Sequence, residues 1–192
     1  MTGSRYGDWE RNFNWAVKLG LVAMLISGLV FPDASQFQGK AWPARVVAYP
    51  ISIIIVPIIW AAAGRRGRYP HLVDGLIALP FASDIFGNVV NLFDMVEYFD
   101  DFLHFLNWTF LVAAIVVALT PLRLAAWNRV VLGSGFGAVA IIMWETIEYW
   151  IAESGTTGLN LTYGDTISDL GLSTLGGVAG AIIAVMLRPV KT

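Results

Sequence analysis

Long apolar runs alternate with short polar stretches along the whole chain. Each run approaches the ~20 residues that a helix needs to cross ~30 Å of hydrocarbon, and none shows the alternation of a barrel strand. Backbone groups inside a bilayer must be satisfied within their own segment, so these runs should be helical. The pattern predicts an all-α, polytopic membrane bundle, a single transmembrane domain over residues 1–192. Its six helices are expected at about residues 13–31, 45–63, 72–93, 102–120, 130–151 and 167–187.

Composition supports this class. The 192 residues are 57% hydrophobic and only 14% charged, whereas soluble domains carry about 25% charged residues. The absence of cysteine excludes disulfides, zinc–thiolate sites and thiol nucleophiles. A net charge of −2 gives no indication of nucleic-acid binding, so membrane lipids are the expected partners.

The basic residues predict an orientation. Cytoplasmic loops of membrane proteins are enriched in Lys and Arg. One set of loops and both tails contain Arg5, Arg11, Arg65, Arg66, Arg68, Arg123, Arg129, Arg188 and Lys191. The opposite loops carry only Lys40 and Arg45, together with several acids. Both termini are therefore predicted to lie in the cytoplasm.

Nine polar residues interrupt the apolar runs or border them. A charge in the bilayer core costs at least a few kcal/mol, so such residues usually have a function. They are Asp84, Asn88, Asp100, Asp101, His104, Glu145, Glu148, Asp165 and Asp169. With the predicted orientation and a rise of ~1.5 Å per residue, all of them lie within roughly 15 Å of the outer interface. They are expected to gather at one depth.

Their spacing predicts a metal site. The pairs 101/104 and 145/148 are three residues apart, and the pairs 165/169 and 84/88 are four apart, so each pair shares a helix face. Carboxylates with an Asp-x-x-His pair follow the logic of metal sites in helical bundles. The predicted ligands of a divalent metal ion are Asp101, His104, Glu145, Glu148, Asp165 and Asp169, and the surrounding pocket residues are Asp84, Asn88 and Asp100. Magnesium, manganese, iron, calcium and zinc all remain open.

Simpler interpretations exist for these residues. Asp100 could be a solvated charge of an outer loop, and Asp165 could cap the last helix. His104 could be a hydrogen-bonded histidine of the core. Glu145 and Glu148 could belong to a buried polar network that only specifies helix packing.

Other residues predict details of the helices. Gly176 and Gly180 form a small-xxx-small pair that is typical of close helix contact. Pro80 removes a backbone hydrogen bond and should kink the third helix. Asp74 and His71 lie near the inner interface, where they are expected to snorkel toward water.

Four stretches carry a resemblance to known proteins: SDIFGNVVNLFD, FDDFLHFLNW, WETIEYW and YGDTISDLGLSTLGG. They resemble the YjdF-like family of uncharacterised bacterial integral membrane proteins over roughly residues 80–180, about half of the chain. A looser resemblance extends to VanZ-like membrane proteins, although Glu148 stands where these usually have Gln. The resemblance implies a common helical core in the bacterial cytoplasmic (inner) membrane and supplies no substrate.

Three hypotheses follow. The first is an outward-facing carboxylate/histidine site that binds metal and supports hydrolysis or transfer on a lipid or lipid-linked substrate. The second is a cation or proton-coupled transporter that uses the same acids. The third is a structural or partner-binding protein with a buried polar network. The sequence leaves open whether the protein is an enzyme, and it gives no oligomeric state.

Overall fold

The computed structural model describes residues 3–155 and 161–190, with side chains from residue 7 onward, and 81% of this part is helical, without strands. The α-helices are α1 (Gly3–Val30), α2 (Trp42–Ala48), α3 (Ile51–Ala62), α4 (His71–Val89), α5 (Leu92–Met95), α6 (Phe99–Ala118), α7 (Ala126–Glu153) and α8 (Tyr163–Leu187). Two short 3-10 turns, η1 (Ser35–Phe37) and η2 (Thr120–Leu122), lie between them.

Six helical stretches of the described chain are long and apolar enough to cross a membrane, as the hydrophobic pattern predicts. They are Gly7–Val30, Trp42–Ala62, His71–Val89, Phe99–Leu122, Ala126–Glu153 and Tyr163–Leu187. The multi-pass helical class is therefore confirmed.

The second span consists of two helices, α2 and α3, where the pattern predicted one. Pro50 has no N–H to donate, so the helix ladder breaks at Tyr49 and Pro50 and resumes at Ile51. The third span is also shorter than predicted. Asn91 adopts a left-handed backbone (φ 62°), which ends α4 and turns the chain into α5.

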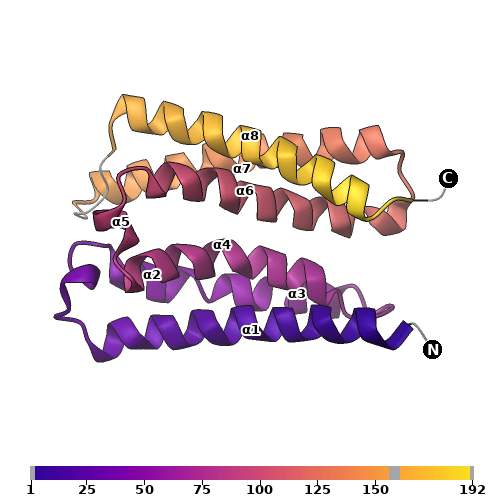
Figure 1. Ribbon diagram of the computed structural model, residues 1–192, viewed down its shortest axis with the longest axis horizontal. Helices are drawn as coiled ribbons and strands as arrows, with labels where there is room; N and C mark the ends of the chain where they lie inside the picture. The colour runs from indigo at the N-terminus through magenta and orange to yellow at the C-terminus, as the bar shows by residue number, and fades with distance from the viewer. Residues whose placement is uncertain (1–2, 156–160, 191–192) are drawn as a thin grey trace.

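The long helices run side by side in two groups (Figure 1). One group contains α1, α2, α3 and α4, and the other contains α6, α7 and α8. Packing of α4 against α6 joins the two groups. The described chain begins and ends at the same end of the bundle, so an even number of crossings connects its two ends (Figure 1).

Helices α6 and α8 approach each other at backbone distance. A Cβ atom added to Gly176 would overlap the carbonyl oxygen of Phe105, and one added to Gly180 would overlap that of Thr109. The Thr109 hydroxyl also donates to the Gly176 carbonyl over 3.0 Å. The predicted small-residue contact is confirmed, and its partner is α6.

A buried ion pair holds α1 against α4. Lys18 Nζ lies 2.5 Å from Asp74 Oδ2, which also accepts hydrogen bonds from Asn14 (2.8 Å) and the Tyr69 hydroxyl (2.6 Å). Burial, followed by the hydrogen bond to Asp74, raises the pKa of Tyr69 and keeps this hydroxyl a donor. The snorkelling expectation is wrong for Asp74, which is fully buried because α1 supplies a cation; partly buried His71 contacts Asn14 at 3.2 Å.

A second buried cation closes the end of the bundle where the chain begins and ends. Arg129 of α7 is buried and donates to the carbonyl oxygens of Val116 (3.0 Å) and Arg188 (2.9 Å), and to the Thr120 hydroxyl (3.0 Å). These acceptors follow or end α6 and α8, where carbonyl groups lack partners within the helix. Arg129 thus serves as a shared C-terminal cap.

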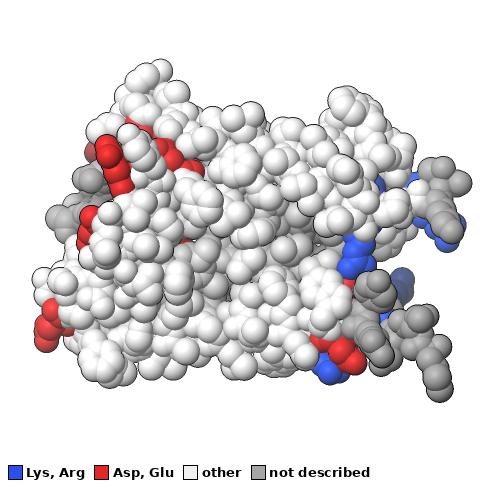
Figure 2. Space-filling model, viewed as in Figure 1, with Lys and Arg blue, Asp and Glu red and all other residues white. Residues whose placement is uncertain are grey.

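Charged residues gather at the two ends of the bundle (Figure 2). Acidic side chains dominate the end that carries α5, whereas most of the visible Lys and Arg lie at the end of the two termini. The white surface between these ends is the band that hydrocarbon would cover. This separation follows the charge asymmetry of the sequence, and the direction of insertion stays a prediction.

Candidate functional site

A cavity of about 690 Å³ lies between the two helix groups, toward the acidic end. Side chains from α2, α4, α6, α7 and α8 line it. Seven of the nine polar residues that the sequence singles out are among its lining residues: Asp84, Asn88, Asp100, His104, Glu148, Asp165 and Asp169. These seven side chains therefore border one cavity, and their common depth in a membrane stays a prediction.

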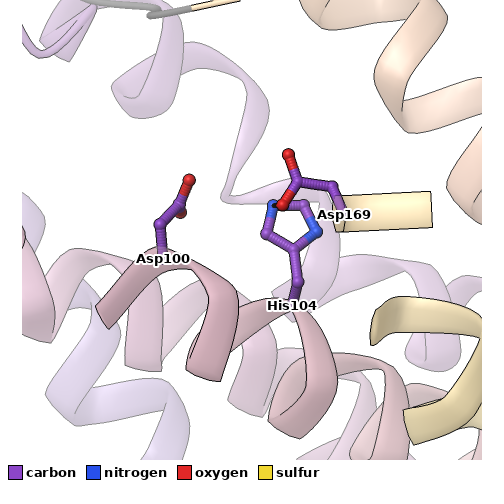
Figure 3. A group of neighbouring side chains, drawn as sticks. All are labelled: Asp100, His104 and Asp169. Atoms are coloured by element: carbon purple, nitrogen blue, oxygen red, sulfur yellow. Dashed lines mark ion pairs between the residues drawn. The ribbon is translucent and has the colours of Figure 1, made fainter. Parts of the chain in front are cut away.

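Three of the lining residues form a tight group of potential metal ligands. Asp100 and His104 project from α6, and Asp169 reaches them from α8 (Figure 3). One ligand atom from each residue lies within 4.8 Å of the other two. His104 and Asp169 are buried, whereas Asp100 is the exposed member. The spacing of Asp100 and His104, one helical turn apart, aligns both on the same face of α6.

His104 is held from three sides. Its Nδ1 lies 3.0 Å from the Ser173 hydroxyl on α8, and its ring stacks on Trp108 with centroids 5.8 Å apart. On the other side, Nε2 lies 3.6 Å from Asp169 Oδ1, which exceeds hydrogen-bond distance. The imidazole therefore has a fixed orientation and presents Nε2 toward the carboxylates.

Glu148 and Asp165 line the same cavity from α7 and α8. Asp165 lies in the first turn of α8, but it is not the cap of that helix. Thr162 is the N-cap, and its hydroxyl accepts from the Asp165 backbone N–H over 3.1 Å. The capping interpretation of Asp165 is therefore wrong, and its carboxylate remains free to face the cavity.

Glu145 of α7 is not among the lining residues of the cavity and is 7% exposed. Both of its carboxylate oxygens are buried, and neither has a hydrogen-bond partner among the described residues. Such a group is costly unless it binds a proton or a cation.

Asp101 lies outside the cluster of three. Its Oδ1 accepts from the Ser168 hydroxyl over 2.8 Å, and it does not line the cavity. Successive helical residues point about 100° apart, so Asp100 and Asp101 flank His104 on opposite sides. The sequence predicts Asp101 as a metal ligand and Asp100 as a surrounding pocket residue. In the structure Asp100 belongs to the group of potential ligands, and Asp101 lies outside it.

Asp84 lines the cavity and forms an ion pair with Arg45. Arg45 donates to it from Nε over 3.0 Å, and the Tyr49 hydroxyl donates to it over 2.8 Å. Asn88 donates to the Asp84 carbonyl over 2.9 Å, while its own side-chain oxygen is buried without a partner among the described residues. The acid at this position is thus already compensated.

Lys40 brings a second cation to the cavity rim. Its Nζ lies 2.5 Å from Asp94, and its carbonyl oxygen accepts from Arg45. The sequence identifies Lys40 and Arg45 as the basic residues of this side but gives no sign of their ion pairs. It also gives no sign that Ser173 holds the histidine, because that contact depends on the packing of α6 on α8.

Comparison with known proteins gives one match. Residues 13–189 match the family DUF2238, described as a predicted membrane protein. No curated protein and no solved structure matches the chain. The finer resemblance to YjdF-like and VanZ-like proteins stays a prediction. Because the match covers nearly the whole chain, including all six candidate spans in full or in large part, the protein belongs to the DUF2238 family of predicted membrane proteins.

Proposed function

We propose that Asp100, His104 and Asp169 bind a divalent metal ion, and that the protein uses it to hydrolyse or transfer a group of a lipid or lipid-linked substrate. The observation that carries this proposal is the convergence of the three side chains, with ligand atoms within 4.8 Å of one another. Carboxylates and an imidazole from two facing helices are a common ligand set in helical bundles.

The distance between two of the three ligand atoms supports this proposal. Two ligands at about 2.1 Å from one metal are about 3.0–3.4 Å apart in octahedral or tetrahedral geometry. The 3.6 Å between His104 Nε2 and Asp169 Oδ1 is close to this value. Ser173 supports the proposal too, because metal-binding histidines usually engage a partner through the other ring nitrogen.

The remaining groups have complementary roles. A bound metal would polarise a phosphoryl or acyl oxygen or activate water. Glu148 lines the cavity outside the group of three, where its carboxylate can hold the proton that a nucleophile releases. Arg45 and Lys40 also line the cavity, where they can contact an anionic oxygen of the substrate.

Transport is the second candidate. Its support is the Lys18–Asp74 pair, which places buried charges in the half of the bundle away from the cavity. A carrier needs polar groups at more than one depth. These groups lie between α1 and α4, whereas the cavity acids are spread over α4, α6, α7 and α8, so hydrolysis or transfer remains the leading proposal.

Metal analysis of the detergent-purified protein tests the proposal. We expect about one equivalent of metal in the wild type, its loss in His104→Ala and Asp169→Asn, and its retention in Asp101→Asn. The last variant is the matched control because Asp101 contacts Ser168 outside the group of three.

A wild-type protein without stoichiometric metal, and with a Tm unchanged by chelator, would refute the metal site. Ion flux into proteoliposomes that is lost in Glu148→Gln would then favour transport. If folding and every activity survive all of these substitutions, the network serves packing alone.

A further inference from the structure

The cavity changes character along the helix axis. Its acidic end contains Asp100 and Asp169, whereas its far end is lined by Leu111, Phe136 and Val139. Asp100 and Leu111 are eleven residues apart on α6, which corresponds to about 16 Å of helix. A charged end and an apolar end in one cavity match the two parts of a lipid.

The apolar part opens toward the bilayer. Phe136, Val139, Met143 and Ile147 line the cavity from α7, yet they are 43%, 60%, 60% and 45% exposed. These positions are spaced at three and four residues, so they form one stripe along the helix. A stripe that lines the cavity and is also exposed can give a ligand a sideways route past α7.

The acidic end has more acidic than basic side chains. Lys40 and Arg45 are paired with Asp94 and Asp84. Five lining acids remain: Glu97, Asp100, Glu148, Asp165 and Asp169. Ionised acids beyond the two charges that a divalent ion would offset favour a ligand with a positive group. Lys40 and Arg45 have more N–H donors than their ion pairs use, and a neighbouring phosphate can accept from these donors.

We propose that this cavity binds an aminophospholipid from the surrounding bilayer. One acyl chain lies along the α7 stripe, the primary ammonium faces the acids and the phosphate lies near Lys40 and Arg45. The cavity volume of about 690 Å³ is within the usual range of small-molecule sites. This proposal rests on the proposed function, since it names the substrate class of the same site.

Two substitutions on α7, one inside the cavity and one outside it, test whether the acyl chain binds along the α7 stripe. Val139 and Ile142 are 60% and 58% exposed on α7, but only Val139 lines the cavity. We expect Val139→Trp to weaken binding of a primary-ammonium phospholipid about tenfold or more, and Ile142→Trp to leave it unchanged. Native mass spectrometry of the delipidated protein, titrated with that lipid, measures both. Equal binding by the two variants would overturn the α7 route.

The head group is tested on the wild-type protein with two further phospholipids of the same acyl chains, one with a trimethylammonium and one with a glycerol head group. We expect the primary-ammonium lipid to bind best and the glycerol lipid at least tenfold more weakly. Equal affinities would overturn the head-group assignment.

Metal content measured in the same samples separates the two proposals. A metal-free protein that keeps this lipid preference refutes the metal site and supports the lipid site. A protein with stoichiometric metal and no lipid preference supports the metal site and refutes the lipid site.

Discussion

Ser173 illustrates how a residue without strong ligand chemistry can control a site. Its hydroxyl lies 3.0 Å from His104 Nδ1 and is fully buried between α6 and α8. Without this contact, the imidazole would be held only by its stacking on Trp108 and by Asp169. The orientation of Nε2 toward the carboxylates thus depends on a neighbouring helix.

We therefore expect Ser173→Ala to lower metal affinity about 10- to 100-fold while the protein stays folded, because outer partners of a ligating histidine have effects of this size. Competition with a chromogenic chelator measures the affinity. Ser168→Ala is the control, since its hydroxyl donates to Asp101 outside the cluster. Equal losses in the two variants would argue that Ser173 has no specific role at His104.

The exchange of Asp100 and Asp101 shows what residue spacing can and cannot predict. Both acids are close to one turn from His104, so spacing alone allows either to join it. The choice depends on which side of α6 faces α8 and which faces the cavity. In the folded chain the Ser168 hydroxyl donates to Asp101, whereas Asp100 lines the cavity. The sequence thus predicts the cluster but not its exact members.

At the level of helices, the contact of α6 with α8 determines the site geometry. Gly176 and Gly180 allow the two backbones to touch at about two and three helical turns after Asp169. Because both helices contribute ligands, a change in their separation also changes the distance between His104 and Asp169. Stability and metal affinity should therefore change together.

We expect Gly176→Ala to destabilise the protein by about 1–3 kcal/mol, because the new methyl group overlaps the backbone of Phe105. Gly171→Ala is the matched control on α8, where an added Cβ meets nothing within 4 Å. That variant should be neutral or gain up to about 1 kcal/mol through helix propensity. Thermal unfolding in detergent compares the two, and similar Tm values would contradict the close contact.

Hydrophobic length predicts the number of spans well, because it depends on bilayer thickness rather than on tertiary contacts. It predicts breaks poorly. Pro50 separates α2 from α3, whereas Pro57 and Pro80 lie within continuous helices. The consequence of each proline depends on neighbours that can accept the freed backbone groups, and a single sequence does not reveal them.

At the level of the whole molecule, charge separates the two ends of the bundle (Figure 2). The end with the described termini is the basic one, which the positive-inside rule assigns to the cytoplasm. This orientation stays a prediction, and it would place the cavity toward the outer side.

Single-cysteine labelling tests this orientation cleanly, because the chain contains no cysteine. We expect Met95→Cys, at an exposed position on α5, to react with a membrane-impermeant maleimide in intact cells. Arg66→Cys, in the loop between α3 and α4, should react only after permeabilisation. The unsubstituted chain is the control for background, and the opposite pattern would invert the topology.

The backbone contact at Gly176 and Gly180 has a consequence for ion choice. Side chains adjust to ions of different radius at little cost, but two helices in backbone contact do not separate freely. An ion between His104 and Asp169 would bind side chains that belong to α6 and α8, the two helices in backbone contact. The glycines would then keep the separation of the two ligand-bearing helices constant, so that only the side chains could adapt to ions of different radius.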